Sequence, residues 1–396
     1  MKRILYVFIV ILGLQVSCKK FEPVAPEEHE TLDGPLANLT DEQRAIFLRG
    51  DRAFNNDIFT KETGLGPLFV STSCGSCHAG DGKGHPFTTL TRFGQVDEQG
   101  NLFSHAGGPQ LQNRAIPGHL PETIPTGATF SKFTPPANSG LGYLDAVTDA
   151  DILAMADPND ADGDGISGTP NWVVLKDYIT PRQGSIIVSG KHIGRFGKKG
   201  AAYNLLQQTA AAYNQDMGIT STYEPYDTYS NEEIDPEVSN QTIQDVVFYL
   251  RTLKAPIPRT PDNANVLTGK NLFAQVNCNK CHASELKTGT STITALSNQT
   301  FMPYTDLLLH DMGKGLDDGY TEGSAKTYEW RTPPLWGLGL SKISQGGTYY
   351  LLHDGRARNI EEAILLHGGE AANSITSYKA LSSDDKKKLI AFLESL

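Results

Sequence analysis

The same five-residue pattern occurs twice in the chain. It reads Cys74-Gly75-Ser76-Cys77-His78 in the first half and Cys278-Asn279-Lys280-Cys281-His282 in the second. This C-x-x-C-H pattern is typical of covalently attached c-type haem. In that chemistry the two thiols form thioethers with the vinyl groups of one porphyrin, and the histidine that follows binds the iron as its proximal ligand. The sequence therefore predicts two covalent haem c groups.

Paired cysteines have two other common uses, in a zinc ribbon and in a redox dithiol. A zinc ribbon needs its two cysteine pairs close together, whereas Cys74 and Cys278 lie in different halves of the chain. A redox dithiol needs no histidine after its second cysteine, yet His78 and His282 follow both pairs. Both observations favour haem over the alternatives.

The residue on the other side of each iron decides what each haem can do. Two axial protein ligands suit electron transfer, whereas an open position suits chemistry. For the second haem the prediction is Met312, which follows His282 at a distance that lets a loop wrap around the haem edge, and His310 and Met302 compete with it. For the first haem no downstream histidine or methionine stands out, which is consistent with an open iron. These residues are His85, His105, His119, His192, Met155 and Met217.

An acidic loop between the two motifs resembles the start of a calcium-binding loop. Asp160, Asp162 and Asp164 alternate along it, and Gly165 permits the tight turn that makes alternate side-chain oxygens converge. Asn171 stands where such loops usually carry a glutamate, so the match is partial. The alternative is a solvated acidic turn. The oxygen ligands favour calcium, which would fix this segment against the haem domains.

The first residues are typical of an export signal. Lys2 and Arg3 precede an apolar run from Ile4 to Leu14 that is too short to span a bilayer. A cysteine after a small residue at its end, Cys18, predicts a lipoprotein that is cleaved and acylated there; the alternative is an ordinary signal peptide with an incidental cysteine. We expect a signal over residues 1–18, a flexible tether over 19–36, and a periplasmic or cell-surface protein that meets the membrane through its lipid anchor only.

Composition narrows the class of protein. The formal net charge is −11, which argues against nucleic-acid binding and gives no attraction to anionic lipid. The chain has five cysteines; Cys18 belongs to the signal boundary and the other four to the two motifs, so none is left for a disulfide. With 39 glycines and 22 prolines, much of the chain should be loop.

The helical patterns repeat around the two motifs. A helix is expected before each one, over residues 40–54 and 268–276, and the first opens with a capping box. Apolar residues recur at three- and four-residue spacing in 243–253 and again after Ser382. We therefore predict a mainly α fold with extensive loops, made of two cytochrome c-like domains. The first, 37–256, carries a long insertion, and the second is 257–396.

Longer motifs point to a family. The chain resembles the di-haem oxidoreductases often labelled thiol oxidoreductases, which are related to bacterial di-haem cytochrome c peroxidases and to the MauG group. The resemblance runs from about Leu48 to the C-terminus. It is carried by GLGPLF (64–69), GGPQLQ (107–112), DADGDGISGTP (160–170), GRFG (194–197), DMGIT (216–220), PYTDLLLHDMG (303–313), EWRTPPLW (329–336) and LHDGRA (352–357).

The resemblance implies a peroxidase-like mechanism. The peroxidase relatives bind the second iron with a methionine from the loop that corresponds to Met312. They place a glutamate and a glutamine over an open first haem, and here Asp145 and Gln110 are the candidates, with Asp145 standing where the family more often has glutamate. Peroxide or another small oxidant would react at the first haem. Electrons would arrive from a small redox protein through the second.

Some roles stay open in the sequence. Trp330 or Trp336 would help electrons pass between the haems or would pack in the core. Arg195, Arg331 and Arg356 would pair with haem propionates or would hold loops. Against the enzyme stand two other functions, an electron carrier with both irons six-coordinate and an accessory redox partner of a surface protein. No cysteine is left over for dithiol chemistry.

Overall fold

The computed structural model describes residues 25–94, 96–97, 100–101 and 109–396. Within these ranges, helices alternate with long loops, and parts of the loops pair as six two-stranded antiparallel sheets. The fold is therefore mixed, which corrects the prediction of a mainly helical chain, whereas the extensive loops are confirmed. The ribbons form because connections that run through the interior must pair their backbone N–H and C=O groups.

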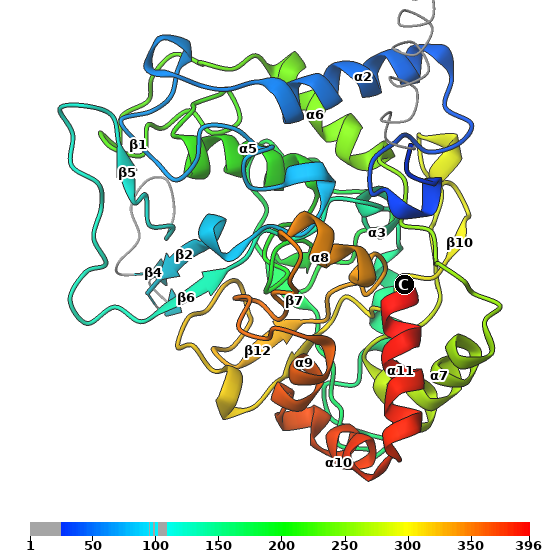
Figure 1. The fold of residues 1–396 in the computed structure, drawn as a ribbon. Coiled ribbons are helices and arrows are strands. Elements are labelled where there is room, and N and C mark those ends of the chain that lie inside the picture. The colour runs from blue at the N-terminus through cyan, green and yellow to red at the C-terminus, as the bar shows by residue number, and fades with distance from the viewer. Residues whose placement is uncertain (1–24, 95, 98–99, 102–108) are drawn as a thin grey trace, which may run out of the picture.

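The elements follow one another with long connections in the first half of the chain (Figure 1). The α-helices are α2 (Asp41–Asn56), α3 (Leu141–Asp145), α4 (Asp149–Met155), α5 (Leu205–Met217), α6 (Asn240–Thr252), α7 (Ala264–Gln275), α8 (Ser341–Ser344), α9 (Ile360–Leu366), α10 (Ala372–Ala380) and α11 (Ser383–Ser395). The paired strands are β1 (Leu68–Phe69) with β5 (Arg114–Ala115), β2 (Leu90–Phe93) with β6 (Phe130–Phe133), β3 (Val96–Asp97) with β4 (Gly100–Asn101), β7 (Asn171–Val173) with β8 (His192–Gly194), β9 (Leu286–Lys287) with β10 (Thr300–Phe301), and β11 (Leu309–Asp311) with β12 (Glu329–Arg331).

Helices α2 and α6 cross closely at one end of the molecule (Figure 1). The predicted capping box opens α2, because the Thr40 side chain accepts a hydrogen bond from the Gln43 backbone and the Gln43 side chain accepts one from the Thr40 backbone. The crossing point is Gly50, where an added Cβ would lie 2.1 Å from the carbonyl oxygen of Asp245. A glycine here lets the two backbones touch.

Helices α7 and α11 repeat this arrangement at another side of the molecule (Figure 1). The crossing point is Gly269, whose added Cβ would lie 2.0 Å from the Lys388 carbonyl oxygen and 2.7 Å from Phe392 Cβ. Helix α7 starts at Ala264, four residues before the predicted start, because Asn263 caps it by accepting a hydrogen bond from the Asn265 backbone. The four helices predicted around the two motifs are therefore present.

Larger side chains at the two crossing glycines should destabilise the protein. Gly50→Ala and Gly269→Ala are each expected to lower the free energy of unfolding by about 1–3 kcal/mol, because the helices must move apart. Gly315→Ala is the matched control: an added Cβ there meets nothing within 4 Å, so its change should stay within about 0.5 kcal/mol. Guanidinium denaturation of the haem-loaded proteins measures all three. Equal losses in all three would contradict close packing at the crossings.

Each helix pair belongs to its own hydrophobic core. The first core joins α2 and α6 to α5 and β8, through residues such as Phe54, Ile193 and Met217. The second core joins α7 and α11 to α9, through Phe273, Ala363 and Phe392. The predicted domain boundary at residue 256 falls in the connection between α6 and α7.

The chain before α2 is attached to the end of α6 and to the segment just before α3. Leu32 and Leu36 are buried, the Leu36 N–H donates to the Thr252 carbonyl at 2.8 Å, and Ser139 Oγ donates to the Leu32 carbonyl at 3.0 Å. The last part of the predicted tether, 19–36, is thus packed rather than free, because these two leucines remove apolar surface from water. The predicted signal and Cys18 lie outside the described residues. In the part of the chain that is described, no helix has the length and apolar character to cross a membrane.

Candidate haem sites

The first C-x-x-C-H motif follows α2 and forms a tight turn. The N–H groups of Cys77 and His78 both donate to the Cys74 carbonyl, at 3.1 and 3.0 Å. The His78 ring lies 5.9 Å from the ring of Phe54 in α2, and its Nδ1 lies 2.9 Å from the Pro136 carbonyl oxygen. With Nδ1–H donating to that carbonyl, Nε2 is the ring nitrogen that is left to bind a metal.

The second motif has the same geometry. The His282 N–H donates to the Cys278 carbonyl at 3.0 Å, and the His282 ring lies 6.3 Å from that of Phe273 in α7. Its Nδ1 lies 3.0 Å from the Tyr304 carbonyl oxygen. Two motifs far apart in the sequence therefore orient their histidines in the same way.

The protonation states suit haem. Burial lowers the pKa of His78 and of His282 to about 4, so both imidazoles are neutral near pH 7, as an iron ligand must be. The four cysteines of the motifs form no disulfide with one another. Burial raises the pKa of Cys74 and of Cys278 to about 12, which disfavours the thiolate that dithiol exchange would need. The donor set therefore fits thioether-linked haem with histidine ligation.

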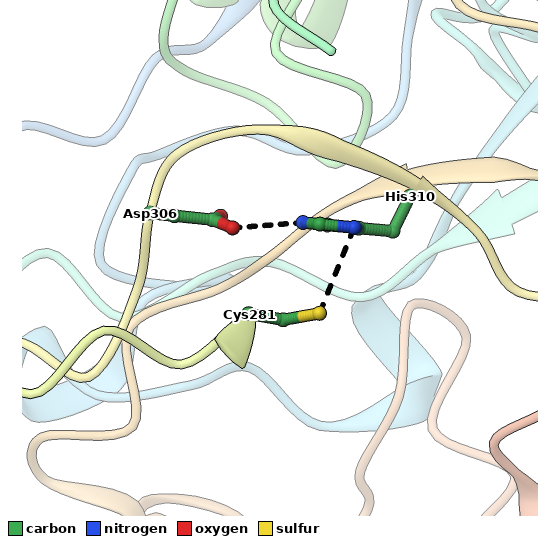
Figure 2. Close-up of side chains that lie close together, drawn as sticks. All are labelled: Cys281, Asp306 and His310. Atoms are coloured by element: carbon green, nitrogen blue, oxygen red, sulfur yellow. Dashed lines mark hydrogen bonds and ion pairs between the residues drawn. The ribbon is translucent and has the colours of Figure 1, made fainter. Parts of the chain in front are cut away.

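His310, one of the competitors for the second iron, is fully engaged elsewhere. Its Nε2 lies 2.8 Å from Asp306 Oδ2 and its Nδ1 lies 2.6 Å from Glu370 Oε2 and 3.6 Å from Cys281 Sγ; Figure 2 shows His310 between Asp306 and Cys281. Burial would lower the pKa of His310, but these hydrogen bonds raise it well above its usual range. With carboxylates at both of its ring nitrogens, His310 has no nitrogen free to bind the iron.

Met312 and His367 lie in different surroundings. The Met312 side chain packs against a small cluster that contains Phe133 and Trp330. His367 follows α9, which packs in the second core beside Phe273, and its Nδ1 lies 2.7 Å from the carbonyl of its own helix residue Ala363. Burial lowers the pKa of His282 to about 4, and the charge of His367 acts in the same direction.

His367 was not singled out in the sequence. A histidine after an amphipathic helix is common, and this one is marked only by its place after α9, in the same core as Phe273. Met302, the third competitor, is half exposed. The role of Met312 as a ligand stays a prediction.

Gln110 contacts the carboxylate of Asp216, which was not among the site residues predicted from the sequence. Its Nε2 donates to Asp216 Oδ1 at 2.5 Å, and its Oε1 accepts from Arg92 at 3.3 Å. Burial raises the pKa of Asp216 to about 6, against the opposing effects of Gln110 and Arg92. The charge of Asp216 in turn raises the pKa of Cys74, so this group lies near the first haem motif. Its only signal in the sequence is its place in the DMGIT motif.

Asp145 lies apart from this group. Its carboxylate is 3.1 Å from Arg251 Nε and 3.6 Å from Arg182 NH2. At the end of α3, the carbonyl of Asp145 also accepts a hydrogen bond from Arg195. The two predicted catalytic residues, Asp145 and Gln110, are thus held by different partners, and Asp145 is neutralised by two guanidinium groups.

The acidic loop brings three carboxylates together, but this set differs from the predicted Asp160, Asp162 and Asp164. Carboxylate oxygens of Asp157, Asp160 and Asp162 lie within 4.8 Å of one another. Asp164 instead pairs with Lys280, inside the second motif, at 2.9 Å. The loop is therefore docked on the second haem motif by an ion pair, and calcium binding by the loop stays a prediction.

The three candidate propionate partners separate into two groups. Arg195 pairs with Asp149, and Arg356 pairs with Asp354 at 2.7 Å. Among the described residues, Arg331 donates to carbonyl oxygens, those of Gly197 at 3.0 Å and Thr332 at 3.1 Å, and forms no ion pair. Of these three arginines it is therefore the one best able to bind another anion.

Comparison with known proteins agrees with this geometry. The sequence model of the family described as "Di-haem oxidoreductase, putative peroxidase" matches residues 133–396, which include the second motif. The chain belongs to the di-haem oxidoreductase family. In this di-haem oxidoreductase the first motif, 74–78, lies upstream of the matched segment. None of the curated proteins compared with the di-haem oxidoreductase matches it.

Two solved structures are similar over nearly the whole length. Hydrazine synthase of Kuenenia stuttgartiensis is 14% identical, with 95% of this di-haem oxidoreductase and 96% of that chain covered and a TM-score of 0.40. A MauG-like protein associated with microbial copper homeostasis is 15% identical, with 95% of both chains covered and a TM-score of 0.40. The family assignment rests on the family match and not on these two.

Proposed function

We propose that the protein is an exported c-type di-haem oxidoreductase with peroxidase-like activity at its first haem. The observation that carries this proposal is the repeated site. In each half, a C-x-x-C-H turn follows a helix, and the histidine Nδ1 is held by a backbone carbonyl. In each half, that helix also crosses another at a glycine. We interpret each half as one cytochrome c unit that carries one covalent haem.

At the first site, different residues would attach the haem, bind the iron and transfer protons. Cys74 and Cys77 would hold the porphyrin, and His78 would bind the iron through Nε2; the haem supplies the redox chemistry that cleaves peroxide. Reduction of peroxide to two waters takes up two electrons and two protons, so a group that moves protons is needed. Asp216, with Gln110 donating to its Oδ1, would accept a proton at Oδ2 and return it. Its pKa near 6 suits both steps.

At the second site, Cys278, Cys281 and His282 would hold a haem whose iron has two protein ligands. His367 follows α9, which shares a core with Phe273, and the Phe273 ring lies 6.3 Å from that of His282. Because Nδ1 of each histidine is held by a carbonyl, this placement favours His367 as the second ligand. Met312 is the alternative that the family resemblance implies. Either ligand set makes this haem an electron relay, and a small redox protein would supply its electrons.

The export signal supports a periplasmic or cell-surface location, with an acyl anchor at Cys18. The oxidant would be peroxide or another small molecule, and calcium would bind the acidic loop at Asp157, Asp160 and Asp162. A different function, electron transfer between other proteins, follows if the first iron also has two protein ligands. The His367 observation bears only on the second haem, so it does not favour this alternative.

The spin states of the two irons test the proposal. EPR and absorption spectra of the purified holoprotein, as isolated and half-reduced, should show one high-spin and one low-spin haem. The high-spin signal should change when peroxide is added. Two low-spin haems in both redox states, unaffected by peroxide, would leave an electron-transfer protein. A preparation without covalent haem would refute the proposal as a whole.

A further inference from the structure

Most buried cationic side chains of this protein are matched by acceptors. Arg92 lies 2.6 Å from Glu322, and Arg195 pairs with Asp149. Lys199 is fully buried, and its ammonium donates to the carbonyls of Lys326, Thr327 and Glu329 at 3.0, 3.1 and 2.7 Å. Such pairing is expected, because an unpaired buried charge is costly.

Three half-buried cations depart from this pattern. Lys83 donates to one carbonyl, that of Leu352, at 3.3 Å, and Arg331 donates to carbonyls only. The Lys198 ammonium has no hydrogen bond within the described part of the chain. None of the three forms an ion pair with a described carboxylate. Together they form the cation cluster, defined as Lys83, Lys198 and Arg331.

The three charges act on one another. Burial lowers the pKa of Lys198 well below its usual range, the charges of Lys83 and Arg331 lower it further, and only Asp354 opposes them. Asp354 is already paired with Arg356. The carboxylate that acts on Arg331 is Asp306, and it is paired with His310 in turn. Neither Asp354 nor Asp306 is therefore free to balance the charge of the cluster.

The cluster is built from segments of both halves of the chain. Lys83 follows His78 by five residues in the sequence, and the charge of Lys198 is close enough to His78 to lower its pKa. Arg331 ends β12 in the second half, and its backbone N–H donates to the Lys198 carbonyl at 3.1 Å. Lys83 and Lys198 are therefore associated with the first motif. Arg331 belongs to the second half of the chain and contacts the Lys198 backbone.

We propose that Lys83, Lys198 and Arg331 bind the propionate carboxylates of the first haem, which rests on the proposed function. Haem carries two carboxylates at one edge, and guanidinium and ammonium groups bind carboxylates with strong charge-assisted hydrogen bonds. The two propionates would supply the acceptors that Lys83, Lys198 and Arg331 lack among the described residues. Because Arg331 comes from the second half of the chain, the first haem would also hold the two halves together.

Lys198→Met in the haem-loaded protein tests this proposal. Both haems should stay attached, because the thioethers do not depend on Lys198. The propionate bending bands of the first haem in resonance Raman spectra should shift as their hydrogen bond is lost. Its midpoint potential should fall, because a positive charge that favours the reduced iron is removed, and should become dependent on pH as a propionate begins to titrate. Lys198→Arg should restore the wild-type behaviour.

Lys199→Met is the matched control. It removes a neighbouring buried lysine whose donors are satisfied by carbonyls, so it should lower stability without moving the propionate bands or the potential of the first haem. Unchanged bands and potential in Lys198→Met would overturn the proposal, as would a first-haem potential that depends on added phosphate, which would mark a site for a diffusible anion. A wild-type protein with no haem would instead overturn the proposed function as well.

Discussion

Asp216→Asn is expected to slow peroxide turnover by about 10²–10⁴-fold, the usual contribution of a positioned acid–base group. Asparagine keeps the acceptor that Gln110 needs, through its side-chain oxygen, but it cannot carry a proton. Stopped-flow reaction of peroxide with the holoprotein measures the effect. The EPR and absorption spectra before peroxide should stay those of the wild type, which separates loss of proton transfer from loss of structure.

The pH dependence gives a second readout of the same residue. Burial raises the pKa of Asp216 to about 6, and the groups that oppose this are Gln110, as a donor, and Arg92, as a charge. The carboxylate is the form that accepts a proton, so the wild-type rate should rise as the pH increases through about 6. Asp216→Asn should lose this rise.

Two further variants sharpen the test of Asp216. Asp145→Asn examines the carboxylate that the family resemblance suggests; because Asp145 is neutralised by Arg182 and Arg251, we expect a much smaller loss of rate. Asp384→Asn, at an exposed position of α11, should leave the rate unchanged. A loss in Asp145→Asn with full activity in Asp216→Asn would return the acid–base role to Asp145.

His367→Met is expected to raise the reduction potential of the second haem, because a thioether stabilises ferrous iron relative to imidazole. The shift should be on the order of 0.1 V, within the roughly 0.8 V range that axial ligands span. His367→Ala should open the coordination position and give a high-spin signal. Met312→Leu, in contrast, should leave the second haem low-spin with an unchanged potential, because Met312 packs against Phe133 and Trp330.

Spectroelectrochemical titration with EPR at each potential distinguishes the two ligands. A high-spin second haem in Met312→Leu, together with an unaltered one in His367→Ala, would establish Met312 and contradict our assignment. A low-spin second haem in both variants would mean that another side chain binds the iron.

The sequence predicted the features of the structure that depend on residues close together in the chain. The two C-x-x-C-H turns, the capping box at Thr40 and the four helices around the motifs depend on short spacings and on apolar periodicity, and all of them appear in the structure. The short β-ribbons were not expected, because each consists of two to four residues in a loop without alternation. Such segments pair because of where the rest of the fold places them.

The contacts in the site between segments far apart in the chain could not be predicted from the sequence. Gln110 was a candidate, but its partner Asp216 comes from α5, 106 positions further along the chain. Lys280 was part of a motif, yet its ion pair with Asp164 depends on how the acidic loop docks. Unpaired charges such as Lys198 are recognisable only when all the neighbours are known. No spacing rule in the sequence contains this information.

The crossing of α2 and α6 has a consequence for how the chain can vary in length. The crossing joins residues as far apart as Arg49 and Asp245, 196 positions along the chain. The entropy of closing a flexible loop grows only slowly with its length, by about 0.6 kcal/mol for each doubling. The long segment between the first motif and α6 therefore adds little to the cost of bringing the two helices together. Surface loops of that segment should tolerate insertions and deletions far better than the glycine at the crossing tolerates a methyl group.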